Sequence, residues 1–363
     1  MFAQRLQRAR KAAGLSMSKL AEEVGVSANA IKKYEHGINM PSSNNLLKMA
    51  NVLNVRTEYF FRPVEVELHE IEYRKKSNLP KKLLNRLTAD VMNQAERWSM
   101  LLDLYPDTDN PIPTFSLPAD LPAEVGDLEE IEDVSNQMRQ AWNLGLDPIP
   151  ELVTAMESKG TMVICTQVEG VNRFDGLAGR IGNFPVVVFS NHLTGDRQRF
   201  TLAHELGHLV LFNRLAENLD EEKACNRFAG AFLLPKKAVV EIMGKHRHTI
   251  EPIELLLLKH EFGISMTAIL MRLEQCGVIS ANLKKQYFIE FSKLGWRKNE
   301  PGEPYPKESS FRFKQLVCRA LAEEYIGESK AAELLGMSVY RFHMSRKLEG
   351  NLEGSVGVND QRC

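Results

Sequence analysis

Two histidines and a glutamate stand at a spacing that can hold and use a metal ion. Residues 197–212 read RQRFTLAHELGHLVLF, in which His204 and His208 are four positions apart. In a helix this spacing places both imidazoles on one face, where they can ligate one zinc ion. Glu205 can then reach a water molecule at the open coordination position and accept its proton. The chain has only 9 histidines in 363 residues, so a chance match is expected at the level of about a few per cent.

An open zinc site needs a third protein ligand, and a second apolar stretch supplies one. Residues 221–235 read EEKACNRFAGAFLLP and predict a helix that ends at the proline. Glu222 and Asn226 share a face of this helix. Glu222 can be the third ligand, and Asn226 can hydrogen-bond a ligating histidine and fix its ring. Glu217 and Glu221 are competing carboxylates, which we interpret as solvated charges near the helix start.

The two stretches resemble the ImmA/IrrE family of zinc metallopeptidases. Beyond the HExxH motif, the match falls on Glu222, Asn226, Phe228, Ala229 and Pro235. The chain departs from the family at Ala224, which is usually acidic or an amide, and at Cys225, which is usually alanine. The resemblance implies a gluzincin-like domain that hydrolyses peptides with zinc. It also implies a substrate lying extended beside a strand, which we expect to be residues 186–191.

Strands and helices that could position this site surround it in the sequence. Residues 161–166 and 185–189 are rich in β-branched and apolar side chains and predict two strands. The glycine-rich stretch between them predicts a hairpin. Amphipathic helical patterns precede the strands, and further helical patterns cover residues 252–294. We therefore expect the metallopeptidase domain to span residues 123–295.

The first 63 residues alternate short apolar helical patterns with serine caps and terminating glycines. The run LAEEVGVS at 20–27, followed by IKKYEHG at 31–37, resembles the Xre family, the Cro and lambda-repressor type of helix-turn-helix. The resemblance implies a five-helix domain, residues 1–63, whose third helix enters the major groove of DNA. Met17 is a departure, because this family usually opens its second helix with glutamine there.

Five residues at the start of the third helix are expected to face DNA. Asn29 is the candidate base reader, since its amide can bond adenine twice. Lys32 and Lys33 would hold phosphates, which gives affinity without sequence information. The full predicted set is Ser27, Ala28, Asn29, Lys32 and Lys33. One such module offers few base contacts, so we expect a homodimer on a double-stranded DNA operator.

Two further regions complete the predicted organisation. Residues 64–122 predict a helical connector, with apolar residues at helical spacing from Pro80, followed by a proline-rich linker. Residues 296–363 open with a Pro/Gly-rich break and predict a helical C-terminal region with a disordered tail. Within it, residues 328–338 have the cadence of a helix-turn-helix, although no complete third element is evident.

Composition limits the classes of protein and sets the expected compartment. Lys and Arg number 46 and Asp and Glu 47, so any DNA-binding surface must be local. We expect no membrane association, because no apolar run has the length of a span and no signal-peptide pattern opens the chain. The five cysteines have no C-x-x-C spacing, which favours a reducing cytoplasm. We predict a cytoplasmic bacterial protein that associates with the nucleoid when bound to DNA.

These observations predict a mainly α fold with a small β-sheet, of the α+β class. The expected function is that of a DNA-binding regulator whose zinc endopeptidase domain cleaves a repressor protein or the chain itself. Two alternatives remain open. The metallo-domain could be a sensor without turnover in a transcription factor, or the chain could be an antitoxin that grips a toxin partner.

Overall fold

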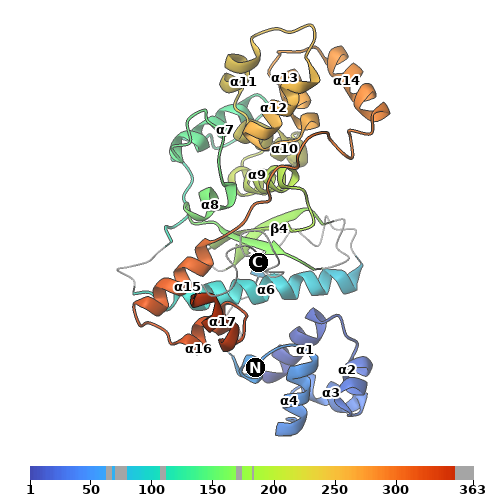
Figure 1. The fold of residues 1–363 in the computed structure, drawn as a ribbon, viewed down its shortest axis with the longest axis vertical. Helices are drawn as coiled ribbons and strands as arrows, with labels where there is room; N and C mark the ends of the chain where they lie inside the picture. The colour runs from blue at the N-terminus through green and yellow to red at the C-terminus, as the bar shows by residue number, and fades with distance from the viewer. Residues whose placement is uncertain (63–67, 70–79, 107–111, 169–173, 182–183, 348–363) are drawn as a thin grey trace.

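The computed structural model of the chain describes residues 1–62, 68–69, 80–106, 112–168, 174–181 and 184–347. Within these residues the fold is mostly helical around one small sheet, as expected from the sequence (Figure 1). The N-terminal helices form one end of the molecule, helix α6 and the C-terminal helices lie next to the sheet, and helices α11–α14 form the other end. The predicted disordered tail falls outside the described residues. Among those described, no helix has both the length and the hydropathy to cross a membrane.

The N-terminal domain is a compact group of short helices, three of which start at a serine cap. The helices are α1 (Phe2–Ala12), α2 (Met17–Val24), α3 (Ala28–Glu35), α4 (Ser43–Val52) and the 3-10 helix η1 (Thr57–Phe61). The fifth predicted helix is therefore a 3-10 helix. Ser27 caps α3 by accepting from the Ala30 amide at 3.1 Å, and Gly25 adopts φ +79°, a left-handed conformation that favours glycine.

A buried ion pair fixes the third helix against the first. Arg10 donates through Nη2 to Oε2 of Glu35 at 2.8 Å, and its Nε donates to Oε1 at 2.5 Å. Around this pair the apolar residues Leu6, Leu20, Ile31 and Phe60 are fully buried. Within α3, Ile31 and Glu35 are four residues apart and form the buried face, which leaves the opposite face to solvent.

The sheet has four strands among the described residues, in the order β1-β3-β4-β2. The strands are β1 (Leu68–His69), β2 (Met162–Thr166), β3 (Gly176–Ile181) and β4 (Phe184–Ser190). β2 runs parallel to β4, with Ile164 opposite Val188, whereas β3 runs antiparallel to β4. The predicted strands at 161–166 and 185–189 are present, and the glycine-rich stretch contributes β3.

Alternate residues of β2 and β4 enter two separate hydrophobic cores. Val163 and Phe189 lie on the first face of the sheet, toward the helices that carry the predicted zinc site. Ile164 and Val188 lie on the second face, against α6 (Lys81–Leu102) and the C-terminal helices. A third core lies inside the N-terminal domain.

Helix α6 and the C-terminal helices cover the second face of the sheet together. The C-terminal helices are α15 (Arg312–Ala322), α16 (Glu328–Leu334) and α17 (Val339–Arg346). Trp98 of α6 packs edge-on against Phe313, and the hydroxyl of Tyr105 donates to the carbonyl of Leu316 at 2.6 Å. The connector and the C-terminal region, more than 200 residues apart in sequence, thus share one core.

The first face of the sheet carries the remaining helices. They are α7 (Glu130–Ala141), α8 (Leu152–Glu157), α9 (Gly195–Leu211), α10 (Glu221–Leu233), α11 (Lys236–Met243), α12 (Pro252–Phe262), α13 (Met266–Gln275) and α14 (Ala281–Lys293). Glu132 of α7 is buried and joins three helices, because it pairs with Arg227 of α10 at 2.7 Å and with Arg272 of α13. These buried ion pairs hold α13 beside α10, where it forms one wall of the cleft described below.

Candidate metal centre

Helix α9 crosses the first face of the sheet directly after β4 and carries the HExxH motif through the core. It begins at Gly195 after the cap residue Thr194, and Asp196 lies in its first turn. Gly207 faces α10, where an added Cβ would lie 3.2 Å from Phe228 and 3.3 Å from the Cα of Cys225. The missing side chain lets the two helices approach closely. This close crossing brings the start of α10 over the two histidines.

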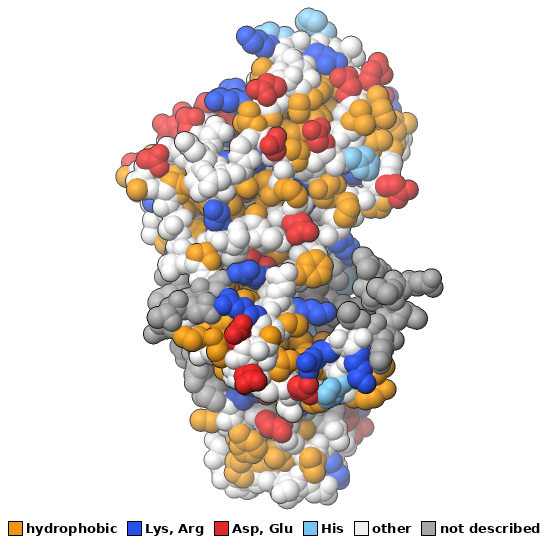
Figure 2. All heavy atoms as spheres, turned by 60° about the vertical axis from the view of Figure 1, so that its left-hand side comes forward, with side chains coloured by type: hydrophobic (Ala, Val, Ile, Leu, Met, Phe, Trp, Pro, Cys, Tyr) orange, Lys and Arg blue, Asp and Glu red, His pale blue; other side chains and the backbone are white. Residues whose placement is uncertain are grey.

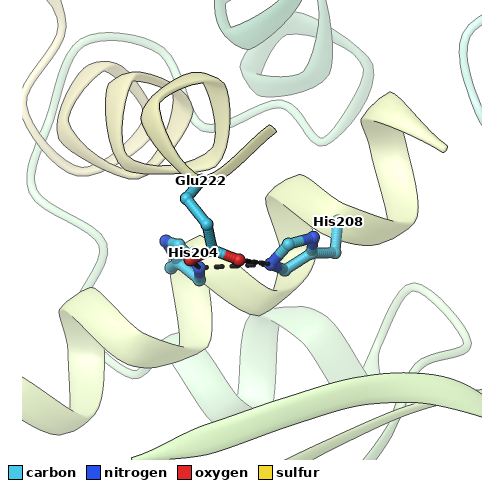
Figure 3. Close-up of side chains that lie close together, drawn as sticks. All are labelled: His204, His208 and Glu222. Atoms are coloured by element: carbon cyan, nitrogen blue, oxygen red, sulfur yellow. Dashed lines mark hydrogen bonds and ion pairs between the residues drawn. The ribbon is translucent and has the colours of Figure 1, made fainter. Parts of the chain in front are cut away.

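The structure brings the three predicted ligands together (Figure 3). His204 and His208 point their Nε2 atoms toward each other at 3.2 Å. The carboxylate of Glu222 lies above both rings, 3.4 Å from Nε2 of His204 and 3.6 Å from Nε2 of His208. One donor atom from each residue lies within 4.8 Å of the others, and in the described part of the chain no other group of histidines, cysteines and carboxylates is arranged this way.

Both histidines are held by their other ring nitrogen. Nδ1 of His204 lies 3.1 Å from Oδ1 of Asn226, which is the orienting contact expected for Asn226. Nδ1 of His208 lies 2.7 Å from Oε1 of Glu221. With Nδ1 donating to an oxygen, the lone pair of each ring is at Nε2 and faces the other residues of the cluster. The sequence reading of Glu221 as a solvated charge missed this contact.

The spacing of the donor atoms fits a small tetrahedral metal ion. Bonds of about 2.1 Å to a tetrahedral ion place two ligand atoms about 3.4 Å apart. The two Nε2 atoms are 3.2 Å apart, close to that value. Each of them also lies 3.4–3.6 Å from one oxygen of Glu222, Oε2 for His204 and Oε1 for His208. Two imidazoles and one carboxylate also leave a fourth position for water or substrate, the arrangement of catalytic rather than structural sites.

Glu205 lies beside the cluster, buried against strand β3. Its side chain packs next to Gly176, where an added Cβ would come within 3.1 Å of Cγ of Glu205 and 2.5 Å of Cγ2 of Thr201. The absence of a side chain at Gly176 therefore makes room for Glu205 and for a close approach of β3 to α9. Nothing in the sequence singled out Gly176 for this role.

A cleft of about 1230 Å³ opens over the cluster. Its walls are β3, the outward face of α9, the start of α10, α13 and residues 297–300. The expectation that residues 186–191 border the cleft was wrong, because the strand residues that line it are residues 176–180 of β3. His192, His246, His248 and His260 are exposed and line no part of this cleft.

The residues where the chain departs from the expected motif lie in the core. Ala224 and Cys225 are both fully buried between α9 and α10. Asp220 starts α10 by accepting from the amide of Lys223 at 2.8 Å, so Glu221 and Glu222 occupy the first turn. The two departures therefore change the packing beneath the cluster. Glu221, Glu222 and Asn226 still contact the two histidines.

The five predicted DNA-facing residues form an exposed patch at the start of α3. Ser27, Ala28, Asn29, Lys32 and Lys33 are all exposed, whereas Ile31 and Glu35 on the opposite face are buried. The helix follows α2 through the turn at Gly25, the geometry in which a recognition helix projects from its domain. The hydroxyl of Ser27 caps the helix.

Comparison with known proteins agrees with both parts of this description. Residues 6–60 match the family described as "Helix-turn-helix", and residues 157–274 match the "IrrE N-terminal-like domain". This chain carries a helix-turn-helix domain and an IrrE-like domain. The IrrE-like domain places the chain's second part among ImmA/IrrE metallopeptidase-like domains, a family that implies a bound metal.

Individual relatives match one part of the chain or the other. The radiation response metalloprotease IrrE of Deinococcus radiodurans is 31% identical over 109 residues, which cover 25% of this chain and 33% of IrrE. The transcriptional regulator ImmR of Bacillus subtilis is 36% identical over 62 residues, 17% of this chain and 49% of ImmR. The phage repressor RstR of Vibrio cholerae is 38% identical over 52 residues, 14% of this chain and 46% of RstR. The matched segments thus span a third to a half of these relatives.

Proposed function

We propose that this protein is a DNA-binding transcriptional regulator whose IrrE-like domain is a zinc-dependent endopeptidase that cleaves a repressor protein or the chain itself. The observation that carries the enzymatic part is the cluster of His204, His208 and Glu222, with both rings fixed through Nδ1. A buried glutamate beside this cluster and an open cleft above it are the remaining requirements of peptide hydrolysis.

The metal would be held by Nε2 of His204, Nε2 of His208 and the Glu222 carboxylate. A zinc ion in this position supplies Lewis acidity, which lowers the pKa of a water molecule and polarises the scissile carbonyl. The residues of the chain perform the proton transfers. Glu205 accepts the proton of the attacking water at its carboxylate and passes it to the nitrogen of the leaving amine.

The cleft suits an extended peptide more than a compact ligand. β3 forms one wall and presents a strand backbone along the cleft, and α13 forms the opposite wall. Among the described residues, β1 pairs with β3 only at Arg180 and Ile181. A peptide laid along residues 176–179 can therefore hydrogen-bond to the remaining edge of β3 while its carbonyl groups pass over the cluster. Binding along the backbone selects for an unfolded or exposed segment of a substrate protein.

The DNA-binding part rests on α3. Asn29 would read a base edge, Lys32 and Lys33 would contact phosphates, and Ser27 and Ala28 would lie at the helix end closest to the groove. We propose a homodimer on a pseudo-palindromic operator, because two copies double the number of base contacts. Cutting a repressor would then release genes that the regulator itself recognises.

Three single substitutions test these roles in one panel, with zinc content, cleavage of candidate repressors and reporter expression as readouts. Glu205→Gln keeps the size of the side chain but accepts no proton, so zinc content should stay near one per chain while cleavage falls by roughly a hundredfold or more. His204→Ala should lose both zinc and cleavage. Asn29→Ala should keep both and relax operator preference.

The panel also separates the enzyme from a sensor. If the zinc-loaded Glu205→Gln protein regulated its reporter like the wild type while His204→Ala failed, regulation would need the metal but no turnover. That result would overturn the endopeptidase proposal and leave the domain as a metal-dependent sensor.

A further inference from the structure

The C-terminal helices repeat the arrangement of the N-terminal helix-turn-helix. A constant shift of 311 residues places α15 on α1, α16 on α2 and α17 on α3, with starts and ends that agree to within one residue. Between Ser18 and Ile31, six of the 14 residues are identical in the shifted segment. The identical pairs are Ser18 and Ser329, Lys19 and Lys330, Ala21 and Ala332, Glu22 and Glu333, Gly25 and Gly336, and Ser27 and Ser338.

The backbone of the turn is also the same. Gly25 and Gly336 both have left-handed φ values, +79° and +68°. The amide after each glycine bonds back to the paired alanine, Val26 to Ala21 at 2.9 Å and Met337 to Ala332 at 3.0 Å.

The side chains around the turn agree as well. The hydroxyl of Ser338 caps α17 by accepting from the Arg341 amide at 3.2 Å, as Ser27 caps α3. Lys19 and Glu22 pair at 3.2 Å, and so do Lys330 and Glu333. Ile31, the residue that anchors α3 in its core, corresponds to Phe342, which is 1% exposed. The repeat thus extends from the sequence to the packing.

A third turn of this kind shows what distinguishes a DNA-binding arrangement from a structural one. Gly263, with φ +66°, and Ser265 lead into α13 in the same way. There Glu300 accepts from the amides of Met266 at 3.0 Å and Thr267 at 3.2 Å. A carboxylate on the first turn would repel a phosphate, and α13 has half of its residues buried. The turn alone therefore does not define a DNA-binding helix.

Helix α17 has the opposite character, since it is exposed and basic. Phe342 is its buried residue, and Tyr340, at the position equivalent to Asn29, is 74% exposed. Residues 338–347 read SVYRFHMSRK and contain three Arg or Lys residues and no acid. Glu328 pairs with His343 at 3.1 Å and with Arg346, while Arg341 and Lys347 are exposed. Figure 2 turns this side of the molecule forward, and shows Lys and Arg side chains there together with several acidic ones.

The two units are neighbours in the molecule (Figure 1). Nη2 of Arg56, at the end of the N-terminal domain, donates to the carbonyl of Met337 in the second turn at 3.4 Å. Arg62 forms an ion pair with Glu333 of α16. A duplex bound by α3 would therefore have a second basic helix attached to the same end of the same chain.

We propose that α15–α17 form a second DNA-binding helix-turn-helix and that α17 contacts double-stranded DNA. Arg341 and Lys347 hold phosphates, and Tyr340 lies at the base-reading position. The function of this site does not depend on α3. The second unit would lengthen the site that one protomer covers and add to its affinity.

The test uses the full chain with the first unit disabled by Lys32→Glu/Lys33→Glu. Binding to a labelled duplex of about 30 base pairs is measured by fluorescence anisotropy between about 50 and 200 mM salt. We expect this protein to keep salt-dependent binding. Adding Arg341→Glu/Lys347→Glu should weaken it by about tenfold or more and reduce the slope of log K against log salt by about two.

A matched charge reversal controls for bulk electrostatics. Lys237 of α11 and Lys245, two residues after that helix, are exposed, and α11 lies at the end of the molecule opposite the N-terminal domain (Figure 1). Lys237→Glu/Lys245→Glu makes the same change in net charge. We expect it to change affinity less than about twofold. The proposal would be overturned if the substitutions at 341 and 347 and those at 237 and 245 weakened DNA binding equally. It would also be overturned if disabling the first unit abolished all binding. Tighter binding to a duplex of RNA than of DNA would also contradict it.

Discussion

Glu221 and Glu222 are adjacent in sequence but differ in what they contact at the cluster. Glu222 faces Nε2 of both histidines, at 3.4 and 3.6 Å. Glu221 faces Nδ1 of His208 at 2.7 Å, on the far side of the ring from the other donor atoms. We therefore propose that Glu222 binds the metal and that Glu221 orients the ring of His208.

The two roles predict different losses of zinc affinity. Glu222→Ala removes a donor atom and leaves two ligands, so zinc should be lost under mild chelation. Glu221→Ala leaves all three donors and frees the ring of His208, which should weaken zinc binding by about 10–100-fold. Competition with a chromogenic chelator measures both, with Glu217→Ala as the control expected to bind zinc like the wild type. Stronger loss in Glu221→Ala than in Glu222→Ala would reverse the assignment.

The residues of the cluster differ in how far the sequence predicts them. His204, His208, Glu222 and Asn226 follow from i, i+4 spacing, because a helix places such pairs on one face. The contact of Glu221 depends on how α10 crosses α9, which no local spacing encodes. The close fit of Gly176 against Glu205 depends on the packing of a strand on a helix, and a glycine in a glycine-rich stretch carries no signal of that.

At the scale of elements, an extended segment between α14 and α15 joins the two faces of the sheet. Glu308 within it is buried and accepts from the amides of Leu152 at 3.2 Å and Val153 at 3.0 Å, at the start of α8. The same carboxylate accepts from Arg199 of α9 at 2.5 Å. Two residues on, the hydroxyl of Ser310 donates to Glu157 at the end of α8 at 2.7 Å. The segment thus ties α9, which carries the HExxH motif, to the C-terminal helices.

Glu157 makes the stability of this junction depend on pH. Burial raises the pKa of Glu157 to about 7, above its ordinary value of 4.5. Between these values the folded chain holds a proton that the unfolded chain releases, so the free energy of unfolding falls as pH rises from 4.5 to 7 and then levels off. The titration of Glu157 lowers the free energy of unfolding by roughly 3 kcal/mol across this pH range.

Glu157→Gln removes this titration and keeps an acceptor for Ser310. Urea unfolding at pH 5, 6, 7 and 8 should show a flatter pH dependence for the variant, and greater stability than the wild type at pH 8. Glu303→Gln, at an exposed position of the same segment, should leave the pH dependence unchanged. Parallel curves for wild type and Glu157→Gln would contradict the raised pKa.

Regular elements were more predictable than the segment that joins them. Serine caps and terminating glycines predicted α2 and α3, and runs of valine and isoleucine predicted β2 and β4, because these signals are local. Residues 299–304 were predicted only as a Pro/Gly-rich break. The buried role of Glu308 was invisible, since one acidic residue in a charged loop looks like any solvated carboxylate until its partners, more than 100 residues away, are in place.

At the scale of the whole molecule, α6 lies between the N-terminal domain and the sheet. Toward the sheet, Asp90 accepts from the hydroxyl of Thr166 at 2.8 Å, and its burial raises its pKa. Gln94 donates to the carbonyl of Cys165 at 3.1 Å. Toward the N-terminal domain, Glu96 pairs with Arg5 and Arg8 of α1. The apolar spacing predicted this helix. It did not predict that one side of the helix contacts the sheet and another contacts the N-terminal domain.

The ion pairs of Glu96 should decide whether the N-terminal domain unfolds together with the rest of the chain. Arg5 is 2% exposed and lies 5.1 Å from the ring of Tyr59, so Glu96→Gln leaves a buried guanidinium without a compensating charge. Removing one partner of a buried pair typically costs about 3–5 kcal/mol. In a small domain this lowers the melting temperature by roughly 10 °C or more. Calorimetry of the variant should therefore show an early transition for the N-terminal domain, followed by a later transition for the rest of the chain. The zinc content of the folded variant should equal that of the wild type. Glu58→Gln, at an exposed position of η1, should melt like the wild type. A single unshifted transition for Glu96→Gln would mean that apolar packing of α1 on α6, rather than these ion pairs, joins the DNA-binding end of the molecule to the metal centre.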